Sequence, residues 1–321
     1  MKTCYNMDIR QDDMPNKHLE HPEDSIFNGR RVALKAITQM ISCETVGIKW
    51  DGAPAVVFGT NPVNGKFFVG TKSVFNKKIP KINYSFDDIE TNHKGDVADI
   101  LRLLFHFAPR IDSIVQADWI GVGGSHSYTP NCLEYRFPTQ VPGYIVIAPH
   151  TLYEQVSADC IGHIGVNLAS SSTCYCVSAT DAWAFVEKEL NFKDQWKSFI
   201  PVFRSKTPHP KVAPKIKQHI NSFVREGRIP DAQEMYNSLP DKYKGEVSVY
   251  TFKAWHYIYQ LKQRLQKSIR ESGDVECYID GQPSKHEGYV INSKTPYKLV
   301  DRLTFSRANF NLSKNWKNEK V

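Results

Sequence analysis

A chain of 321 residues with 41% hydrophobic and 12% aromatic residues is long enough to bury a large core in one or two domains. It contains no apolar run close to the roughly 18 residues of a membrane span, and its first residues do not resemble a signal peptide. These features argue against a membrane protein. Together with seven scattered cysteines, they predict a protein of the reducing cytoplasm.

The first 45 residues are expected to be a segment that packs on the core of the protein. Within it, the run His-Leu-Glu-His-Pro-Glu-Asp at 18–24 combines histidines with carboxylates, which by composition could form a metal site. Pro22, however, interrupts a helix that would align the histidines. Glu23 and Asp24 instead suit the first turn of a helix that begins after the proline, and this is the interpretation we favour.

An apolar run over 46–48 leads into Lys49-Trp50-Asp51-Gly52 and predicts a strand that ends on a lysine. A lysine in such a place can act as a nucleophile if burial or a neighbouring cation lowers its pKa. The same tetrapeptide also occurs by chance where a strand ends in an Asp-Gly turn. By itself it therefore makes Lys49 only a candidate nucleophile.

The next two strand-like runs, 55–59 and 67–73, are separated by an Asn-Gly pair and predict a β-hairpin. The return strand would bring Lys72 back towards the Asp51 end of the hairpin. The alternative for Lys72 is a solvated lysine on an edge strand.

Further strands are expected over 114–121, which contains Asp118, and over 144–148. The second begins with Tyr144, whose ring could stack on a base or could be an ordinary core aromatic. The run Cys-Tyr-Cys at 174–176 predicts two thiols on one face of a strand rather than a metal site.

Residues 181–275 are expected to form a mostly helical and basic insertion, with 17 Lys and Arg against 11 Asp and Glu. Helices are predicted over 181–190, before Gly227, and over 249–272. Cations on the last helix, with nearby aromatic residues, could hold a phosphate backbone and stack on bases. The alternative is a solvated helical face over buried aromatic residues. The cations in question are Lys262, Arg264, Lys267 and Arg270.

Two last strands are predicted over 287–291 and 297–300. Glu287 opens the first in the sequence Glu-Gly-Tyr-Val, and Lys298 is the only cation of the second. The order Lys-x-Asp-Gly, Glu-Gly-x-Val and a lysine-bearing last strand resembles the covalent nucleotidyltransferase superfamily. This superfamily contains ATP-dependent DNA and RNA ligases and mRNA-capping guanylyltransferases.

Longer strings are similar to those of ligase-like proteins from large tailed phages, which would place this chain in the cytoplasm of an infected host cell. These strings cover both ends of the chain and begin at His18, Lys49, Thr129, Lys298 and Phe305.

The resemblance implies an α+β fold, a ligase-type nucleotidyltransferase domain of antiparallel sheets flanked by helices. Residues 46–180 and 276–321 would form this domain, and residues 181–275 would be the helical insertion. The cofactors would be ATP and Mg²⁺. The N-terminal run at 18–24 could line the nucleotide pocket.

In the mechanism that the resemblance implies, the amine of Lys49 attacks the α-phosphorus of ATP. Glu287, with Asp118 in place of the usual Glu, would hold Mg²⁺. Lys298 would lie against the α-phosphate and lower the pKa of Lys49. The nucleotide-binding residues would be Ile48, Asp51, Gly52, Lys72, Asp118, Tyr144, Glu287 and Lys298.

The sequence departs from the superfamily pattern in its last motif. Val300 stands where a second lysine is usual, and Arg302 is the nearest spare cation. On a regular strand Arg302 would lie about 13 Å beyond Lys298. It is therefore expected to contact the nucleic acid or to pair with an acidic neighbour. Ala53 also replaces a side chain that is polar or basic in many relatives.

These features favour an ATP-dependent RNA ligase that joins 5′-phosphate and 3′-hydroxyl ends. RNA is preferred to DNA because the chain after Lys298 is too short for the OB domain usual in DNA ligases. Two alternatives stay open. One is a nucleic-acid-binding protein without catalysis on the same scaffold, and the other is a nucleotidyltransferase that acts on a protein or an RNA 5′ end.

Overall fold

The computed structural model describes residues 19–187, 190, 199–293 and 295–306, and these form an α+β fold. Their strands build three sheets, in which every neighbouring pair except one is antiparallel. Sheet 1 has the order β11-β10-β1-β14-β15 and joins distant parts of the chain. Its strands are β1 (Thr45–Lys49), β10 (Ala182–Val186), β11 (Ile269–Gly273), β14 (Gly288–Ile291) and β15 (Lys298–Val300).

Sheet 2 has the order β3-β2-β4-β7-β8, with β9 parallel to β7. Its strands are β2 (Ala55–Thr60), β3 (Phe67–Thr71), β4 (Ile114–Val122), β7 (Ile145–Tyr153), β8 (Gly162–Ile164) and β9 (Cys174–Cys176). Sheet 3 has the order β13-β12-β6-β5. Its strands are β5 (Ser127–Tyr128), β6 (Glu134–Arg136), β12 (Glu276–Ile279) and β13 (Gln282–Ser284).

The α-helices of the described residues are α1 (Arg30–Ile41), α2 (Phe86–Asn92), α3 (Asp96–Phe107), α4 (Phe199–Arg204), α5 (Ala213–Arg225), α6 (Ala232–Asn237), α7 (Asp241–Lys244) and α8 (Val249–Lys267). Shorter helical turns are η1 (Pro22–Asn28), η2 (Lys72–Phe75) and the π-helical η5 (Arg302–Ser306). No helix in this part of the chain combines the length and apolarity needed to cross a membrane.

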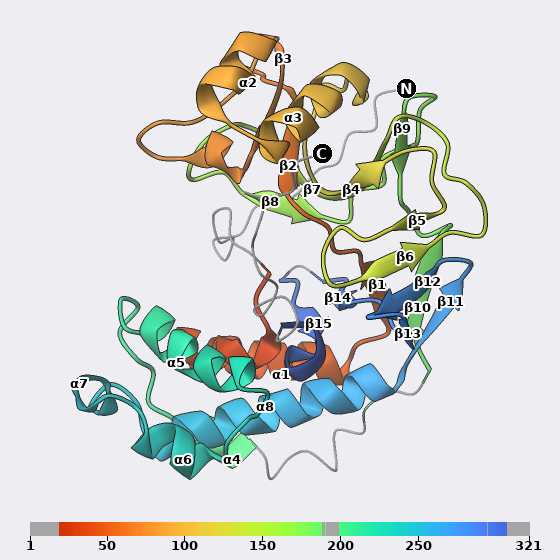
Figure 1. Cartoon of the computed structure of the whole chain (residues 1–321). Coiled ribbons are helices and arrows are strands. Elements are labelled where there is room, and N and C mark those ends of the chain that lie inside the picture. Colours follow the sequence, from red (N-terminus) through yellow and green to blue (C-terminus); the bar gives the residue numbers. More distant parts are fainter. Residues whose placement is uncertain (1–18, 188–189, 191–198, 294, 307–321) are drawn as a thin grey trace.

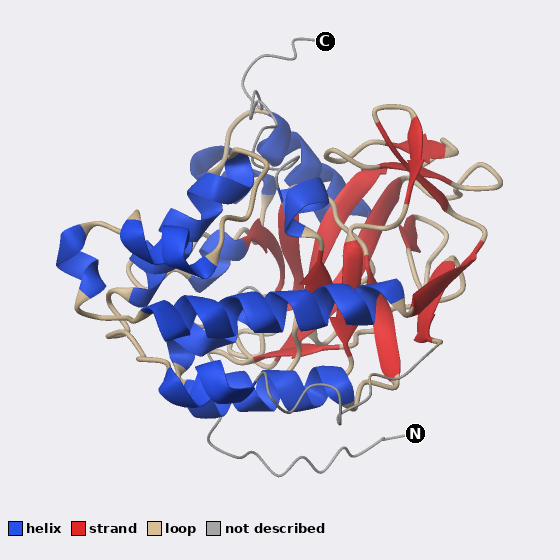
Figure 2. Ribbon diagram, turned by 90° about the horizontal axis from the view of Figure 1, so that it is seen from below, coloured by secondary structure: helices blue, strands red, loops and turns tan. Residues whose placement is uncertain are grey.

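Sheet 1 packs one face on a helical layer, and sheet 2 packs on two helices of its own, α2 and α3. Sheet 2 with α2 and α3 forms the upper part of Figure 1, and α1 with α4–α8 forms the lower part. α1 and α8 run side by side beneath sheet 1 (Figure 2), where alternate strand residues such as Val46, Ile291 and Leu299 share a core with Ile37 and Ile258. The opposite face of sheet 1 carries Lys49, and we call it the Lys49 face.

Several predicted elements are confirmed by the structure. β1 ends on Lys49, β2 and β3 form the hairpin, and β4 and β7 cover the two following runs. The helix that was expected before Gly227 is α5. The thiols of Cys174 and Cys176 are both buried on β9, with their Sγ atoms 3.9 Å apart.

Both ends of the predicted insertion differ from expectation. Residues 182–186 form strand β10 rather than a helix, because small buried Ala182 and Ala184 alternate with exposed aromatic residues and Asp181 accepts a hydrogen bond from Ser178 N within a turn. The last helix was expected to reach residue 272, but α8 stops at Lys267 and the chain enters β11. Pairing with β10 outweighs the helical periodicity there, so 181–275 is a helical layer framed by two strands of sheet 1.

Candidate functional site

The site is built around Lys49, the last residue of the central strand β1. Its strand partner is Gly288, so Glu287, which precedes β14, comes next to it. Lys49 Nζ donates a hydrogen bond of 2.9 Å to Asp51 Oδ1 and a second one to Glu287 Oε2. The side chains of Lys49 and Glu287 are only 19% and 9% exposed. A buried lysine is thus held between two carboxylates.

Tight backbone packing fixes the position of Asp51. The hydroxyl of Tyr135 accepts a hydrogen bond from Asp51 N and donates one to Asp51 O, at 2.9 and 3.0 Å. Asn131 Nδ2 donates to the Asp51 carboxylate. Next to it, a Cβ on Gly52 would stand 2.3 Å from the backbone oxygen of Trp119 on β4, so only glycine allows this approach. The loop therefore ties sheet 1 to sheet 2.

Lys298 lies on the Lys49 face, one row along the sheet. It pairs with Val290, whereas Lys49, Gly288 and Val300 form the neighbouring row. Val300 is 2% exposed and packs in an apolar core, so no second cation stands in the row of Lys49. Lys298 is consequently the motif's one lysine on this face.

The charges at the site act in an unexpected direction. Burial alone would lower the pKa of Lys49, but the carboxylates of Glu287, Asp51 and Asp118 together raise it above its ordinary value. Burial, reinforced by the charge of Lys49, lowers the pKa of Lys298 to about 8. In the free protein the pKa of Lys49 is therefore raised and not lowered, because the three carboxylates outweigh burial.

Burial also raises the pKa of Glu287 to about 7, although Lys49 opposes this rise. The buried pair thus holds one proton tightly, with Lys49 as the ammonium and Glu287 as the carboxylate that faces it. Lys49 is not a free amine in this state.

Sheet 2 supplies two further predicted residues. The strand register places Asp118 opposite Ala55 and Thr71 opposite Val56, so Asp118 and Lys72 meet at the start of β2. The two influence each other, since burial lowers the pKa of Lys72 while Asp118 opposes the fall. Asp118 also lies 3.6 Å from His150 Nε2. The hairpin prediction for Lys72 is confirmed in its placement.

The N-terminal segment also reaches the site. Residue Glu20 forms a β-bridge with Tyr297, and its carbonyl accepts a hydrogen bond of 3.0 Å from Lys298 N. His21 is buried, and burial and the surrounding cations, Arg302 first, hold its pKa well below the ordinary value. The segment thus lies against β15 beside Lys298, which is compatible with the expectation that it lines the nucleotide pocket. His18, the first residue of the run, lies outside the described residues.

Two predicted residues, Tyr144 and Ile48, point elsewhere. Tyr144 is 56% exposed, but its ring stacks on Phe107 of α3 at 4.5 Å between centroids, so its partner is a protein ring. It adjoins Ile145, whose partner Val122 lies four residues beyond Asp118 on β4. Ile48 faces the helical core instead of the Lys49 face.

Lys262 and Arg302 were predicted to bind nucleic acid, but both are buried. Lys262 is 0% and Arg302 3% exposed. Lys262 Nζ donates to Glu23 Oε1 at 2.6 Å and Arg302 Nε to the same oxygen at 2.7 Å, while Arg302 Nη2 donates to Asp24 Oδ2 at 2.6 Å. We call these four residues the buried charge cluster. Because both cations are buried and paired with carboxylates, they cannot contact a nucleic acid. The alternative expectation, that Arg302 pairs with an acidic neighbour, is confirmed.

Arg264, Lys267 and Arg270 remain exposed, although Arg270 stands on β11 and not on a helix. Sequence reasoning missed the roles of Asn131, Tyr135 and the pair Glu23 and Asp24. The string Thr129-Pro130-Asn131 was noticed only as part of a resemblance. An Asn after a proline in a loop gives no sign of its partner 80 residues away.

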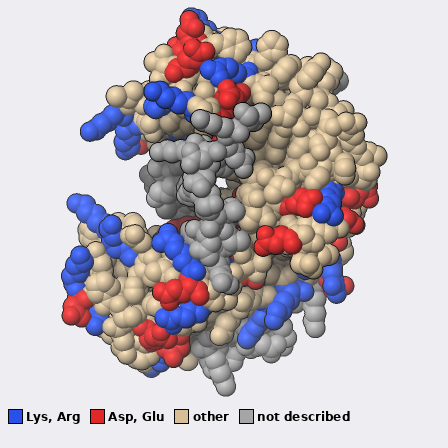
Figure 3. All heavy atoms as spheres, viewed as in Figure 1, with Lys and Arg blue, Asp and Glu red and all other residues tan. Residues whose placement is uncertain are grey.

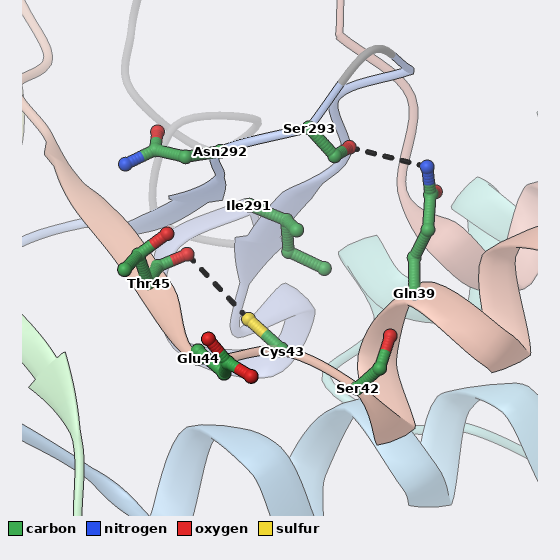
Figure 4. Close-up of a pocket in the computed structure, with 8 residues that line it drawn as sticks. All are labelled: Gln39, Ser42, Cys43, Glu44, Thr45, Ile291, Asn292 and Ser293. Atoms are coloured by element: carbon green, nitrogen blue, oxygen red, sulfur yellow. Dashed lines mark hydrogen bonds between the residues drawn. The ribbon is translucent and has the colours of Figure 1, made fainter.

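The structure also has a pocket of about 260 Å³ at the other end of β1 (Figure 4). It is lined by Gln39, Ser42, Cys43, Glu44, Thr45, Ile291, Asn292 and Ser293. Thr45 and Lys49 are four residue steps apart on β1, which is about 13 Å on a strand. The pocket is therefore separate from the lysine site.

Among the described residues, no group of three or more His, Cys, Asp or Glu side chains is arranged to hold a metal ion. Glu287 and Asp118, the two carboxylates that were expected to hold Mg²⁺, both raise the pKa of Lys49, together with Asp51.

Fold and site together define an α+β protein in which a buried lysine, two carboxylates and a second lysine meet on one face of an antiparallel sheet. The chain belongs to the family described as Family of unknown function (DUF6267), which matches residues 16–251 and 246–314. No curated protein and no solved structure matches the chain.

Proposed function

We propose that this protein is an ATP-dependent nucleotidyltransferase of the ligase type that forms a lysyl-AMP intermediate on Lys49. The observation that carries this proposal is the position of Lys49 at a strand end, in contact with Asp51 and Glu287 and one row from Lys298. The residues that the motif order singled out come from positions almost 250 residues apart in the chain. Their meeting on one face supports a shared chemical role.

In the proposed first step, Lys49 Nζ bonds to the α-phosphorus of ATP, the bond from that phosphorus to the bridging oxygen breaks, and pyrophosphate leaves. Two protons leave the Lys49 nitrogen and go to solvent, one when the ammonium becomes an amine and one when the bond to phosphorus has formed. Mg²⁺, when bound, neutralises charge on the phosphates. Lys298 on the same face stabilises the negative charge that develops at the α-phosphate.

The ion pair between Lys49 and Glu287 gives this step a built-in control. Glu287 Oε2 accepts a hydrogen bond from Lys49. The lone pair that accepts this hydrogen bond cannot bind a metal ion at the same time. If Glu287 ligated Mg²⁺, Lys49 would lose the counter-charge that raises its pKa most, and that pKa would fall. Metal binding would then favour the neutral, nucleophilic form of Lys49.

In the proposed later steps, AMP passes to a 5′-phosphate end, and a 3′-hydroxyl displaces it. RNA is the acceptor that we expect. Incubation with α-labelled ATP tests the first step, and labelled RNA and DNA ends test the acceptor. A transfer to protein or to an RNA 5′ end as a cap would show in the same assay as an acceptor that removes the label.

A second candidate is a nucleic-acid-binding protein without catalysis. The raised pKa of Lys49 and the buried Val300 favour it, since a permanent ammonium between two carboxylates can also be a structural ion pair. Absence of any covalent label at Lys49, in protein freed of bound nucleotide with pyrophosphate, would decide for this candidate.

The pH dependence of Lys49 labelling is a direct consequence of the site. The rate should rise as Glu287, with a pKa of about 7, loses its proton and becomes able to hold the metal ion. It should fall again as Lys298, with a pKa of about 8, loses the charge that binds the α-phosphate. We expect a bell-shaped profile of kcat/KM for ATP between about pH 5.5 and 9.5.

The matched control is Lys298→Arg, whose guanidinium stays charged over this range. This variant should lose the falling limb and keep the rising one. A falling limb that is unchanged in Lys298→Arg would contradict the assignment to Lys298.

A further inference from the structure

The Lys49 face continues from the site onto β10, which carries two exposed aromatic side chains. On β10, Trp183 and Phe185 point to this face, because Ala184 between them packs into the helical core. Both aromatic side chains are 46% exposed. Neighbouring large aromatic residues with this much exposed area on a sheet indicate a binding surface.

The strand register connects these aromatic residues with the site. Trp183 lies opposite Ser272 on β11, and the β1–β10 register continues to place it opposite Gly47. Gly47 is opposite Val290, which is opposite Lys298. Trp183 and Lys298 thus share one row across the sheet, three strand spacings or about 14 Å apart. Gly47 contributes no side chain, so Val290 is the residue of this row whose side chain stands between them.

The next row adds a cation. Phe185 lies opposite Arg270 on the edge strand β11 and opposite Thr45 on β1. Arg270 Nε is 2.8 Å from Glu187 Oε2, but these side chains are 60% and 52% exposed. Because such an exposed ion pair is weak, Arg270 can exchange the carboxylate for a phosphate.

We propose that the surface formed by Trp183, Phe185, Arg270 and Ser272 binds the unpaired end of a single-stranded nucleic acid and leads that end to Lys49. The assignment of the strand as acceptor rests on the proposed function. Flat aromatic faces stack on unpaired bases whatever their sequence. Arg270 and Lys298 stand on either side of the aromatic residues, where phosphates of the same strand can meet them.

Charge alone does not locate this surface. Lys and Arg side chains are spread over the upper and the lower part of the molecule, with Asp and Glu among them (Figure 3). What distinguishes the surface is the combination of exposed aromatic rings, flanking cations and direct continuity with the Lys49 site. A protein partner would be expected to require a larger apolar area than two rings.

The test measures the binding of fluorescently labelled single-stranded RNA and DNA oligonucleotides by anisotropy, in the absence of ATP. Trp183→Ala should weaken binding roughly 5- to 150-fold, the loss of one base stack, and Trp183→Tyr should restore most of it. Phe203→Ala is the matched control, since Phe203 is a 58% exposed aromatic on α4, away from this face. It should bind like the wild type.

Arg270→Gln should reduce the slope of log affinity against log salt by roughly 0.7, whereas Trp183→Ala should leave the slope unchanged. Equal affinity of Trp183→Ala and wild type would overturn the proposal, as would a change of oligomeric state in place of oligonucleotide binding. Labelling of Lys49 by ATP is measured in parallel and should persist in all these variants. Failure of labelling with intact, Trp183-dependent binding would count against the proposed function and leave this surface standing.

Discussion

Lys49→Arg is expected to abolish covalent labelling of the protein by α-labelled ATP and Mg²⁺. The guanidinium keeps a positive charge opposite Glu287 and Asp51, so the ion pairs that hold the site remain. It stays protonated and cannot attack phosphorus. We expect a loss of ~10³-fold or more, because no other described lysine stands between these two carboxylates. The measurement is the radioactivity that stays with the protein band on a denaturing gel.

Lys72→Ala provides the comparison, since Lys72 also lies near Asp118 but follows a strand of sheet 2. It should label more slowly without losing the adduct. Label that persists in Lys49→Arg would place the covalent bond on another residue and end the assignment of Lys49. GTP is expected to label the wild type less well than ATP.

Glu23→Gln is expected to destabilise the protein by about 3–5 kcal/mol, the largest stability effect that the structure predicts. Glu23 is fully buried, and its Oε1 accepts hydrogen bonds from both Lys262 and Arg302. A neutral amide leaves these two buried cations with the single carboxylate of Asp24. Breaking a buried ion pair on one side costs more than the pair contributes, because the remaining charge stays desolvated. Urea unfolding at neutral pH measures the loss.

A double variant separates the ion pair from simple damage to packing. Glu23→Gln combined with Lys262→Met removes one charge of each sign, so the free energy of unfolding should fall by clearly less than the sum of the single effects. Glu90→Gln, which removes an exposed partner of Arg102, is the control and should change stability little. Additive losses in the double variant would contradict the proposed coupling.

The buried charge cluster also changes the meaning of the earlier assignments. It joins the N-terminal turn η1, the long helix α8 and the chain after β15, three segments that pack around sheet 1. Variants of Lys262 or Arg302 should therefore unfold more easily, and they are poor probes of nucleic-acid binding. Any loss of labelling that Arg302→Ala causes must be corrected for its effect on stability.

Local sequence patterns predicted the secondary structure of those segments whose conformation depends mainly on residues close by in the chain. The apolar run over 46–48, the Asn-Gly turn and the helical periodicity after residue 249 are local signals, and β1, the β2–β3 hairpin and α8 follow from them. The same reasoning failed at 182–186 and at 269–273. There the pairing of two strands more than 80 residues apart decides between helix and strand.

Motif order went further, because it identified Lys49, Glu287 and Lys298 before their positions in space were known. The structure brings them together on one face of sheet 1. Periodicity could not tell that the cation at 262 faces the protein interior, since a lysine on the buried side of a helix requires a carboxylate on another segment. That carboxylate, Glu23, is 239 residues away.

By itself, the sequence determined the chemical types available to this protein: a lysine at a strand end, a carboxylate that opens a later strand and a lysine on the last strand. It also determined most of the local conformation that carries them. Only the tertiary structure decided their protonation. A pKa depends on burial and on charges within a few ångströms, and the carboxylates that act on Lys49 come from the residue before β14, from β4 and from the loop after β1.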